Sequence, residues 1–236
     1  SGWNQTAKIL APDGESGDNF ARAVSVSGST IIIGAEGDDA NGNSSGSAYV
    51  FGNTGTGWTL VTKLLASDGA ANDNFGYSVS IAGSRAVVGA WQDSDPDFGL
   101  YSGSAYIFEK GTNGWVEVAK LLPSDGARQN RFGSSVSVYG NKVIVGARSD
   151  GDNGSSSGSA YIFENNASIW QQTVKLLPSD GATSDVFGHS VSISENTVLV
   201  GAFQNDDNGS NSGSIYFFES TTQQIFYADN DGDGFG

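Results

Sequence analysis

The chain has 236 residues with 11 basic and 26 acidic side chains, which gives a formal net charge of −15. A negative field of that size repels phosphate backbones and anionic bilayers, so we expect neither a nucleic-acid partner nor direct membrane insertion. The sequence has no Cys and one His, which excludes disulfides, Cys–His catalysis and a His-rich zinc site. Its 34 Gly residues and 11% aromatic residues favour short strands and tight turns, and therefore an all-β protein.

In chain order, the first predicted element is a short strand that recurs four times. It starts at a Trp, and five residues later a Lys opens an apolar pair, as in Lys63-Leu64-Leu65. An acidic turn such as "SDGAANDNF" follows and ends in a Phe. The period of 55 to 57 residues indicates a repeat architecture. The strands open at Trp3, Trp58, Trp115 and Trp170, and the turns close at Phe20, Phe75, Phe132 and Phe187.

The next two elements of each repeat form a hairpin of constant length. The Phe is 14 residues from the Gly of a Gly-Ala pair in all four copies, so the strand register is fixed. "YSVSIAG" alternates polar and β-branched residues, whereas "RAVVGA" is almost continuously apolar and predicts a strand covered on both faces. "GSAYIF" predicts a third strand. With the Trp strand, each repeat has four short antiparallel strands, the unit of a β-propeller blade.

Phe-Gly before the hairpin, Gly-Ala at its end and Gly-Ser-Ala-Tyr-Ile-Phe in the third strand resemble FG-GAP repeats, the blade units of integrin α-subunit propellers and many bacterial surface proteins. The first copy departs from the pattern, with Phe20-Ala21 where Gly is expected. The resemblance implies a four-bladed β-propeller at residues 1–220, with repeats of about 3–57, 58–114, 115–169 and 170–220. It also implies a secreted or cell-surface protein that acts in binding or adhesion.

The two ends of the repeat array predict how the ring closes. The fourth repeat has no Trp strand after its third strand, whereas "WNQTAKIL" at the N-terminus is a spare one. Docking the spare strand onto the fourth blade would close the ring and remove an exposed edge. Two alternatives stay open: an arc cut from a larger propeller, and a subunit that lends its strand to a neighbour and so builds an extracellular filament.

Acidic segments predict calcium as a cofactor. The family's calcium loop between the first two strands is not expected here, because connections such as "IAGSR" are too short and poor in carboxylates. The loops after Gly-Ala crowd Asp, Asn and Gly together, which suits an oxygen-ligated ion as well as a solvated turn. The acidic tail, residues 221–236, resembles the start of a thrombospondin type 3 repeat, which implies calcium there. The candidate ligands are Asp93, Asp95, Asp97, Asp150, Asp152, Asp206 and Asp207 in the loops, and Asp229, Asp231 and Asp233 in the tail.

One enlarged loop predicts a ligand-binding spot. "WQDSDPDFGLYSGS" in the second repeat adds Trp91, Phe98 and Tyr101, whose rings suit stacking on a sugar. His189 occupies a position that varies among the repeats, which is a poor place for a general base, so we expect no enzymatic activity. The predicted function is a non-catalytic binding module for a glycan or a surface protein. A self-associating filament subunit and an accessory domain of a larger secreted hydrolase are the alternatives.

Overall fold

A computed structural model describes residues 2–220, which form 15 strands in four antiparallel sheets and no helix. The first sheet contains β1 (Val24–Ser27), β2 (Thr30–Ala35), β3 (Ser47–Asn53) and β4 (Trp58–Leu64). The second contains β5 (Phe75–Ala82), β6 (Arg85–Ala90), β7 (Ser104–Gly111) and β8 (Gly114–Leu121). The third contains β9 (Phe132–Tyr139), β10 (Lys142–Ala147), β11 (Ser159–Asn166) and β12 (Ile169–Leu176). The fourth contains β13 (Phe187–Ser194), β14 (Thr197–Ala202) and β15 (Ser214–Glu219).

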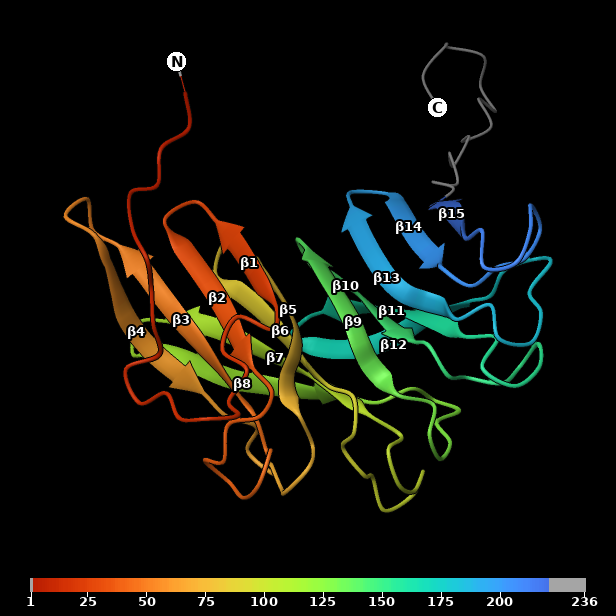
Figure 1. Cartoon of the computed structure of the whole chain (residues 1–236), viewed down its shortest axis with the longest axis horizontal. Coiled ribbons are helices and arrows are strands. Elements are labelled where there is room, and N and C mark those ends of the chain that lie inside the picture. Colours follow the sequence, from red (N-terminus) through yellow and green to blue (C-terminus); the bar gives the residue numbers. More distant parts are fainter. Residues whose placement is uncertain (1, 221–236) are drawn as a thin grey trace, which may run out of the picture.

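The four sheets stand side by side in an arc, as propeller blades do (Figure 1). Strands within each blade follow chain order, and the first strands of successive blades, β1, β5, β9 and β13, contact one another along the inner side. The fourth strand of a blade comes from the following repeat, since β4 begins at Trp58. The predicted all-β propeller fold is confirmed, and each blade is tied to the next repeat by the chain itself.

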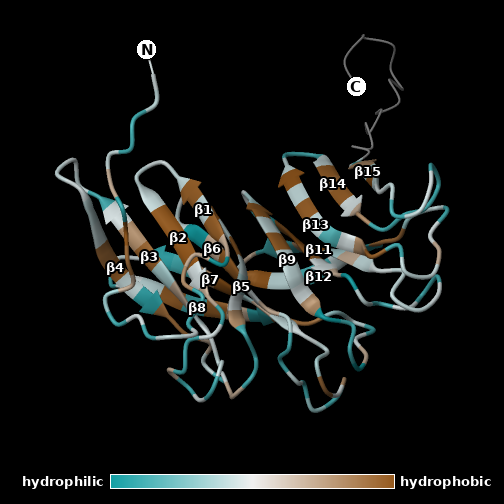
Figure 2. Cartoon of the chain, viewed as in Figure 1, coloured by the Kyte–Doolittle hydropathy of each residue, from teal (hydrophilic) through white to brown (hydrophobic). Residues whose placement is uncertain are grey.

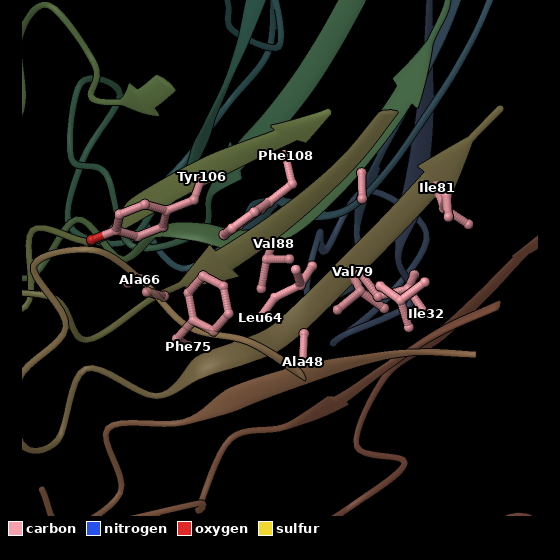
Figure 3. Close-up of a cluster of buried hydrophobic side chains, with 13 residues drawn as sticks. Ile32, Ala48, Leu64, Ala66, Phe75, Val79, Ile81, Val88, Tyr106 and Phe108 are labelled. Carbon is pink, nitrogen blue, oxygen red and sulfur yellow. The ribbon is translucent and has the colours of Figure 1, made fainter. Parts of the chain in front are cut away.

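Each seam between blades is filled by one hydrophobic cluster. Between the first two blades, Ile32 and Leu64 of one sheet pack against Phe75, Val79 and Val88 of the other (Figure 3). The run "RAVVGA" is buried on both faces because alternate residues enter the seams on either side, as predicted. Full burial of one Val, Leu, Ile or Phe side chain in such a cluster contributes about 1.5–3 kcal/mol to stability.

The alternation of Ser and Val in the first strands has a structural cause. Val side chains enter the seams, while Ser hydroxyls accept hydrogen bonds from backbone N–H groups of the next blade's first strand. Ser25 Oγ accepts from Ile81 N at 3.1 Å, and Ser80 Oγ accepts from Val138 N at 3.1 Å. Neighbouring first strands are thus joined through side chains rather than through a backbone ladder.

The Phe-Gly and Gly-Ala pairs interlock across each seam. Gly89 of the second blade faces the carbonyl oxygen of Gly133 in the third, and a Cβ at Gly89 would overlap that oxygen. Gly133 itself has φ +84°, and a Cβ there would overlap the Ser104 carbonyl oxygen. Only Gly permits this close backbone approach together with a positive φ. The Phe-Gly and Gly-Ala pairs therefore make the contact that sets the spacing of the blades.

Closure of the ring by the N-terminal strand is not present. Residues 2–10 form no strand, and within residues 2–220 the fourth blade has three strands where four were expected. Ile9 and Ala11 pack on the first blade instead, and Val24 on the same blade is exposed. The reason is positional: the N-terminal segment is tied to the first blade, at the opposite end of the arc from β15 (Figure 1).

Candidate anion-binding site

Each of the first three blades joins a Lys, a Tyr and two Asp at the turn that precedes its first strand, and we call this set the seam network. In the second blade, Lys120 Nζ lies 2.6 Å from Asp68 and 2.8 Å from Asp93. Tyr106 OH donates to the same two carboxylates at 2.8 and 3.0 Å. The other two networks are Lys63 with Asp13, Asp38 and Tyr49, and Lys175 with Asp125, Asp150 and Tyr161.

Protonation states in the seam networks follow from these contacts. Burial acts to raise the pKa of Asp68, but hydrogen bonds from Lys120 and Tyr106 hold that pKa below its usual value. Burial raises the pKa of Tyr49 to about 12. The Tyr hydroxyls therefore stay protonated as donors, and the Asp68 carboxylate stays charged. The networks are stabilising contacts rather than groups available for proton transfer.

Most carboxylates of the predicted calcium loops make contacts with Lys or with backbone N–H groups. Asp93 and Asp150 face the ammonium groups of seam networks, and Asp152 lies 2.6 Å from Lys175 Nζ. Asp95 accepts from the backbone N–H of Asp97 at 2.9 Å. The remaining loop candidate with a bonded carboxylate is Asp206, which accepts from Asn211 N, while Asp207 donates its own N–H to Asn205.

No group of three or more His, Cys, Asp or Glu side chains suited to a metal occurs within residues 2–220. In this structure the loop carboxylates lie against Lys ammonium groups or backbone N–H groups in several cases. Calcium binding by the loops stays a prediction. Asp229, Asp231 and Asp233 lie outside the described residues. Calcium binding by the tail therefore stays a prediction.

Asp73 is the one acidic residue near these networks whose pKa is raised. Burial, opposed by a hydrogen bond from Ala70 N at 2.6 Å, raises its pKa to about 6. A raised carboxyl pKa destabilises the folded protein as pH increases through that value. Asn130 occupies the same position in the third blade, so Asn fits there. We expect Asp73→Asn to increase the free energy of unfolding by about 1 kcal/mol at pH 7.5 and by little at pH 4, measured by urea unfolding.

The positions at which the repeats differ most lie together at one edge of the blades. The start of each first strand pairs with the end of the second, as in Phe75 with Ala90. Side chains two residues after the Phe and two residues after the Gly of Gly-Ala therefore meet. They are Arg22, Tyr77, Ser134 and His189 in the first position, and Glu36, Trp91, Arg148 and Phe203 in the second.

Cations and aromatic rings alternate in this region, and we call Arg22, Tyr77, Trp91, Arg131, Arg148, His189 and Phe203 the arginine–aromatic cluster. The Tyr77 and Trp91 ring centres are 5.0 Å apart. The Arg22 guanidinium lies 4.2 Å from the Tyr77 ring centre. The Arg131 and Arg148 guanidinium groups each lie 4.9 Å from the Trp91 ring centre. Cation–π contacts hold the guanidinium groups in place and leave them unneutralised.

The cluster is a local positive site on a strongly acidic protein. Arg22 pairs with Glu36 at 3.2 Å, but neither Arg131 nor Arg148 has an acidic partner among the described residues. Burial and the nearby Arg148 lower the pKa of Arg131. The half-buried Arg148 has an Nε without a hydrogen-bond partner in the described part of the chain. Such an arrangement favours binding of an anion.

A hollow of about 290 Å³ opens beside the cluster. Arg22, Arg148 and His189 line it together with hydroxyl-bearing side chains of three blades. Burial, with Arg148 and Arg22 nearby, lowers the pKa of His189, so this imidazole is neutral at pH 7. The hydroxyl groups belong to Ser78, Ser134, Ser135 and Ser190.

The three aromatic residues predicted to bind ligand separate in the structure. Trp91 joins the arginine–aromatic cluster. Phe98 packs over Gly126 in the turn that follows β8, and Tyr101 is exposed at φ +58°. Of the three, only Trp91 lies in the arginine–aromatic cluster, and the prediction from the sequence did not include the arginines. The sequence does contain a signal for them: Arg131 and Arg148 occupy positions at which the other three repeats carry other residue types.

Comparison with known proteins agrees with the repeat geometry. A model of the FG-GAP repeat matches residues 3–51, 58–108, 115–163 and 170–218. The chain belongs to the FG-GAP repeat family. No curated protein matches this FG-GAP chain. Within residues 2–220 no helix is long and apolar enough to cross a bilayer.

Among solved structures, the FG-GAP chain resembles the crystal structure of Sqt1 from Saccharomyces cerevisiae. The TM-score is 0.50 at 12% sequence identity, and the match covers 87% of this chain and 47% of that one. This chain therefore spans about half the length of Sqt1. At this identity the likeness concerns the fold alone.

Proposed function

We propose that the protein is a non-catalytic extracellular binding module that recognises an acidic glycan through the arginine–aromatic cluster. The observation that carries the proposal is the pair of guanidinium groups, Arg131 and Arg148, held against Trp91 without an acidic partner in the described residues. Membership of the FG-GAP family, whose repeats are typical of extracellular proteins, supports the location.

A carboxylate-bearing or sulfated sugar matches the chemistry of the cluster on three counts. Guanidinium groups bind carboxylates and sulfates through paired hydrogen bonds. Ser134 and Ser135 beside the hollow can bond sugar hydroxyls. The remaining field of the protein is negative, so affinity depends on local contacts rather than on long-range attraction.

Replacement of Arg148 by Ala is expected to weaken binding of a soluble polyuronate about tenfold to a hundredfold, since a hydrogen bond to a charged group contributes about 1.5–3 kcal/mol. Arg131→Ala should act similarly. Isothermal titration calorimetry at low and moderate salt would measure both affinities. Binding should weaken as salt rises, because the contact is ionic.

Lys110→Ala is the matched control, because Lys110 is an exposed cation at the end of β7 outside the cluster. It should leave the polyuronate affinity unchanged. A neutral glucan of similar length should not bind. Equal affinity for the glucan and the polyuronate, or tighter binding of an acidic peptide than of the polyuronate, would contradict an acidic glycan as the ligand.

A further inference from the structure

Within residues 2–220, the fourth blade has an open edge where every other blade has a fourth strand. β15 is hydrogen-bonded to β14 along one side, and no strand within residues 2–220 pairs with its other side. In the other blades β4, β8 and β12 fill this place. An unpaired edge strand presents backbone N–H and C=O groups to a further strand.

An apolar groove lies beside β15, at the place of the missing Trp. In the third blade, Trp170 packs on the seam cluster, with the Arg85 guanidinium 4.9 Å from its ring centre. In the fourth blade the corresponding place is hollow, about 370 Å³, and Lys142 stands where Arg85 stands. The groove lining includes Lys142, Leu176, Ile193, Val198, Phe217 and Phe218.

The seam network of the fourth blade is also incomplete. Tyr216 OH donates to Asp180 at 2.9 Å, but no Lys within residues 2–220 reaches this pair. The N-terminal segment carries the missing residue types: Trp3 is fully exposed, and Lys8 follows it at the spacing found in the other three repeats. Lys8 makes no ion pair in the described part of the chain.

Hydrophobic residues occur in the strands at both ends of the arc (Figure 2). Side chains that are buried between blades inside the arc are exposed at its two ends. On the first blade Val24 is 66% exposed, whereas Val79 at the same position of the second blade is 8% exposed. On the fourth blade Phe217 is 69% exposed, whereas Ile107 at the same position is fully buried. Exposed apolar faces of this kind mark interaction surfaces.

The polar groups at the two ends correspond as well. Ser137 Oγ accepts from Ile193 N at 3.2 Å across the third seam. Ser192, on the outer face of the fourth blade, holds the position of Ser137. Val26, on the outer face of the first blade, holds the position of Ile193. The two end faces therefore repeat both halves of an internal seam.

We propose that residues 3–10 of a second copy of this chain form the missing fourth strand of the fourth blade. Trp3 then fills the groove beneath Lys142, and Lys8 pairs with Asp180 and Tyr216. This contact is independent of the proposed glycan site. It gives the chain a self-association surface built like its own seams.

The occupant is a second copy because of where the N-terminal segment leads. Ile9 and Ala11 pack on the first blade, so the sheet that residues 3–10 complete must lie next to that blade. The fourth blade of the same chain lies at the other end of the arc (Figure 1). Two copies can each supply the strand that the other lacks, and both pairs of end faces are then covered.

One residue opposes a tight fit between copies. A Cβ at Gly76 would overlap the Ser47 carbonyl oxygen of the preceding blade, and Ala21 at the corresponding position carries such a Cβ at φ +73°. The intermolecular seam must open slightly at this point. Ala21→Gly should therefore strengthen self-association severalfold.

A charge exchange tests the proposal. Lys8→Asp and Asp180→Lys are each expected to weaken self-association of the full chain at least tenfold, measured by sedimentation equilibrium. An equimolar mixture of the two variants should restore association, because each introduced aspartate then meets an introduced lysine, and each native Lys8 meets a native Asp180. Lys110→Asp, a charge reversal at an exposed site outside the interface, is the control.

Quenching of Trp fluorescence by acrylamide gives a second readout. Trp3→Ala should remove the most accessible emission of the dilute protein and weaken association at least tenfold, whereas Leu100→Ala, at an exposed apolar residue elsewhere, should not. A mixture that stays as weakly associated as its two components would overturn the proposal. So would a native chain that remains monomeric with Trp3 protected, which would mean closure within one molecule.

Discussion

Replacement of Gly89 by Ala is expected to lower the free energy of unfolding by about 3 kcal/mol. The added Cβ would overlap the carbonyl oxygen of Gly133 in the next blade, well inside van der Waals contact. The Ser78 hydroxyl would be displaced as well. Because the clash is with backbone, the two blades must separate, and the buried cluster between them loses contacts. Urea unfolding followed by Trp fluorescence would measure the loss.

Gly201→Ala is the matched control for this substitution. Gly201 holds the same position in the fourth blade, which no further blade follows within residues 2–220, and its added Cβ would meet the Ser190 hydroxyl. A hydroxyl can rotate away, so the expected cost is below about 1 kcal/mol. Equal destabilisation by the two substitutions would show that the interlock between blades does not set the cost.

Replacement of Lys120 by Met is expected to lower the free energy of unfolding by about 3 kcal/mol at pH 7. It leaves the buried Asp93 and the half-exposed Asp68 without their cation, while Tyr106 still donates to both. The exposure of Asp68 keeps the cost at the lower end of the range for broken buried ion pairs. Thermal and urea unfolding would both report it, and Lys110→Met is the exposed control.

The pH dependence of this loss separates charge from packing. The pKa of Asp68 is lowered by its bonds to Lys120 and Tyr106 despite burial, so its stabilisation is present above about pH 4 and is lost as pH falls through the folded pKa. The difference between native protein and Lys120→Met should therefore shrink toward pH 3. Adding Asp93→Asn should recover part of the loss at pH 7, since Asn205 accepts from Ser214 in the fourth blade. A loss that is constant with pH would assign the effect to packing.

The strands and their order could be predicted because the repeats leave few alternatives. The distance from Phe75 to Gly89 recurs in every repeat and so predicts a hairpin. The nearly continuous apolar run "RAVVGA" predicts burial on both faces, as found. The absence of a strand at residues 2–10 could not be predicted, because their sequence pattern is that of β4. Such a segment forms a strand only where a neighbouring blade offers a free edge, and the sequence of the segment itself does not show this.

The function of the acidic residues was harder to predict than their position. Asp93 was predicted as a calcium ligand, and the sequence around it did not indicate its ion pair with Lys120, which belongs to another repeat. The Lys, Tyr and Asp types recur in every complete blade, and that joint recurrence was the available signal. Arg131 and Arg148 were missed for the opposite reason, because they occur once and stand out only when the repeats are aligned by position.

The arrangement of the seams also determines how stability is distributed along the chain. The second and third blades each share two hydrophobic clusters with neighbours, whereas the first and fourth share one full cluster each. Stability then behaves as a sum over nearest neighbours rather than as the property of a single core. Local opening begins at the ends of such an array, so the blades with free edges exchange between closed and open forms before the central pair does.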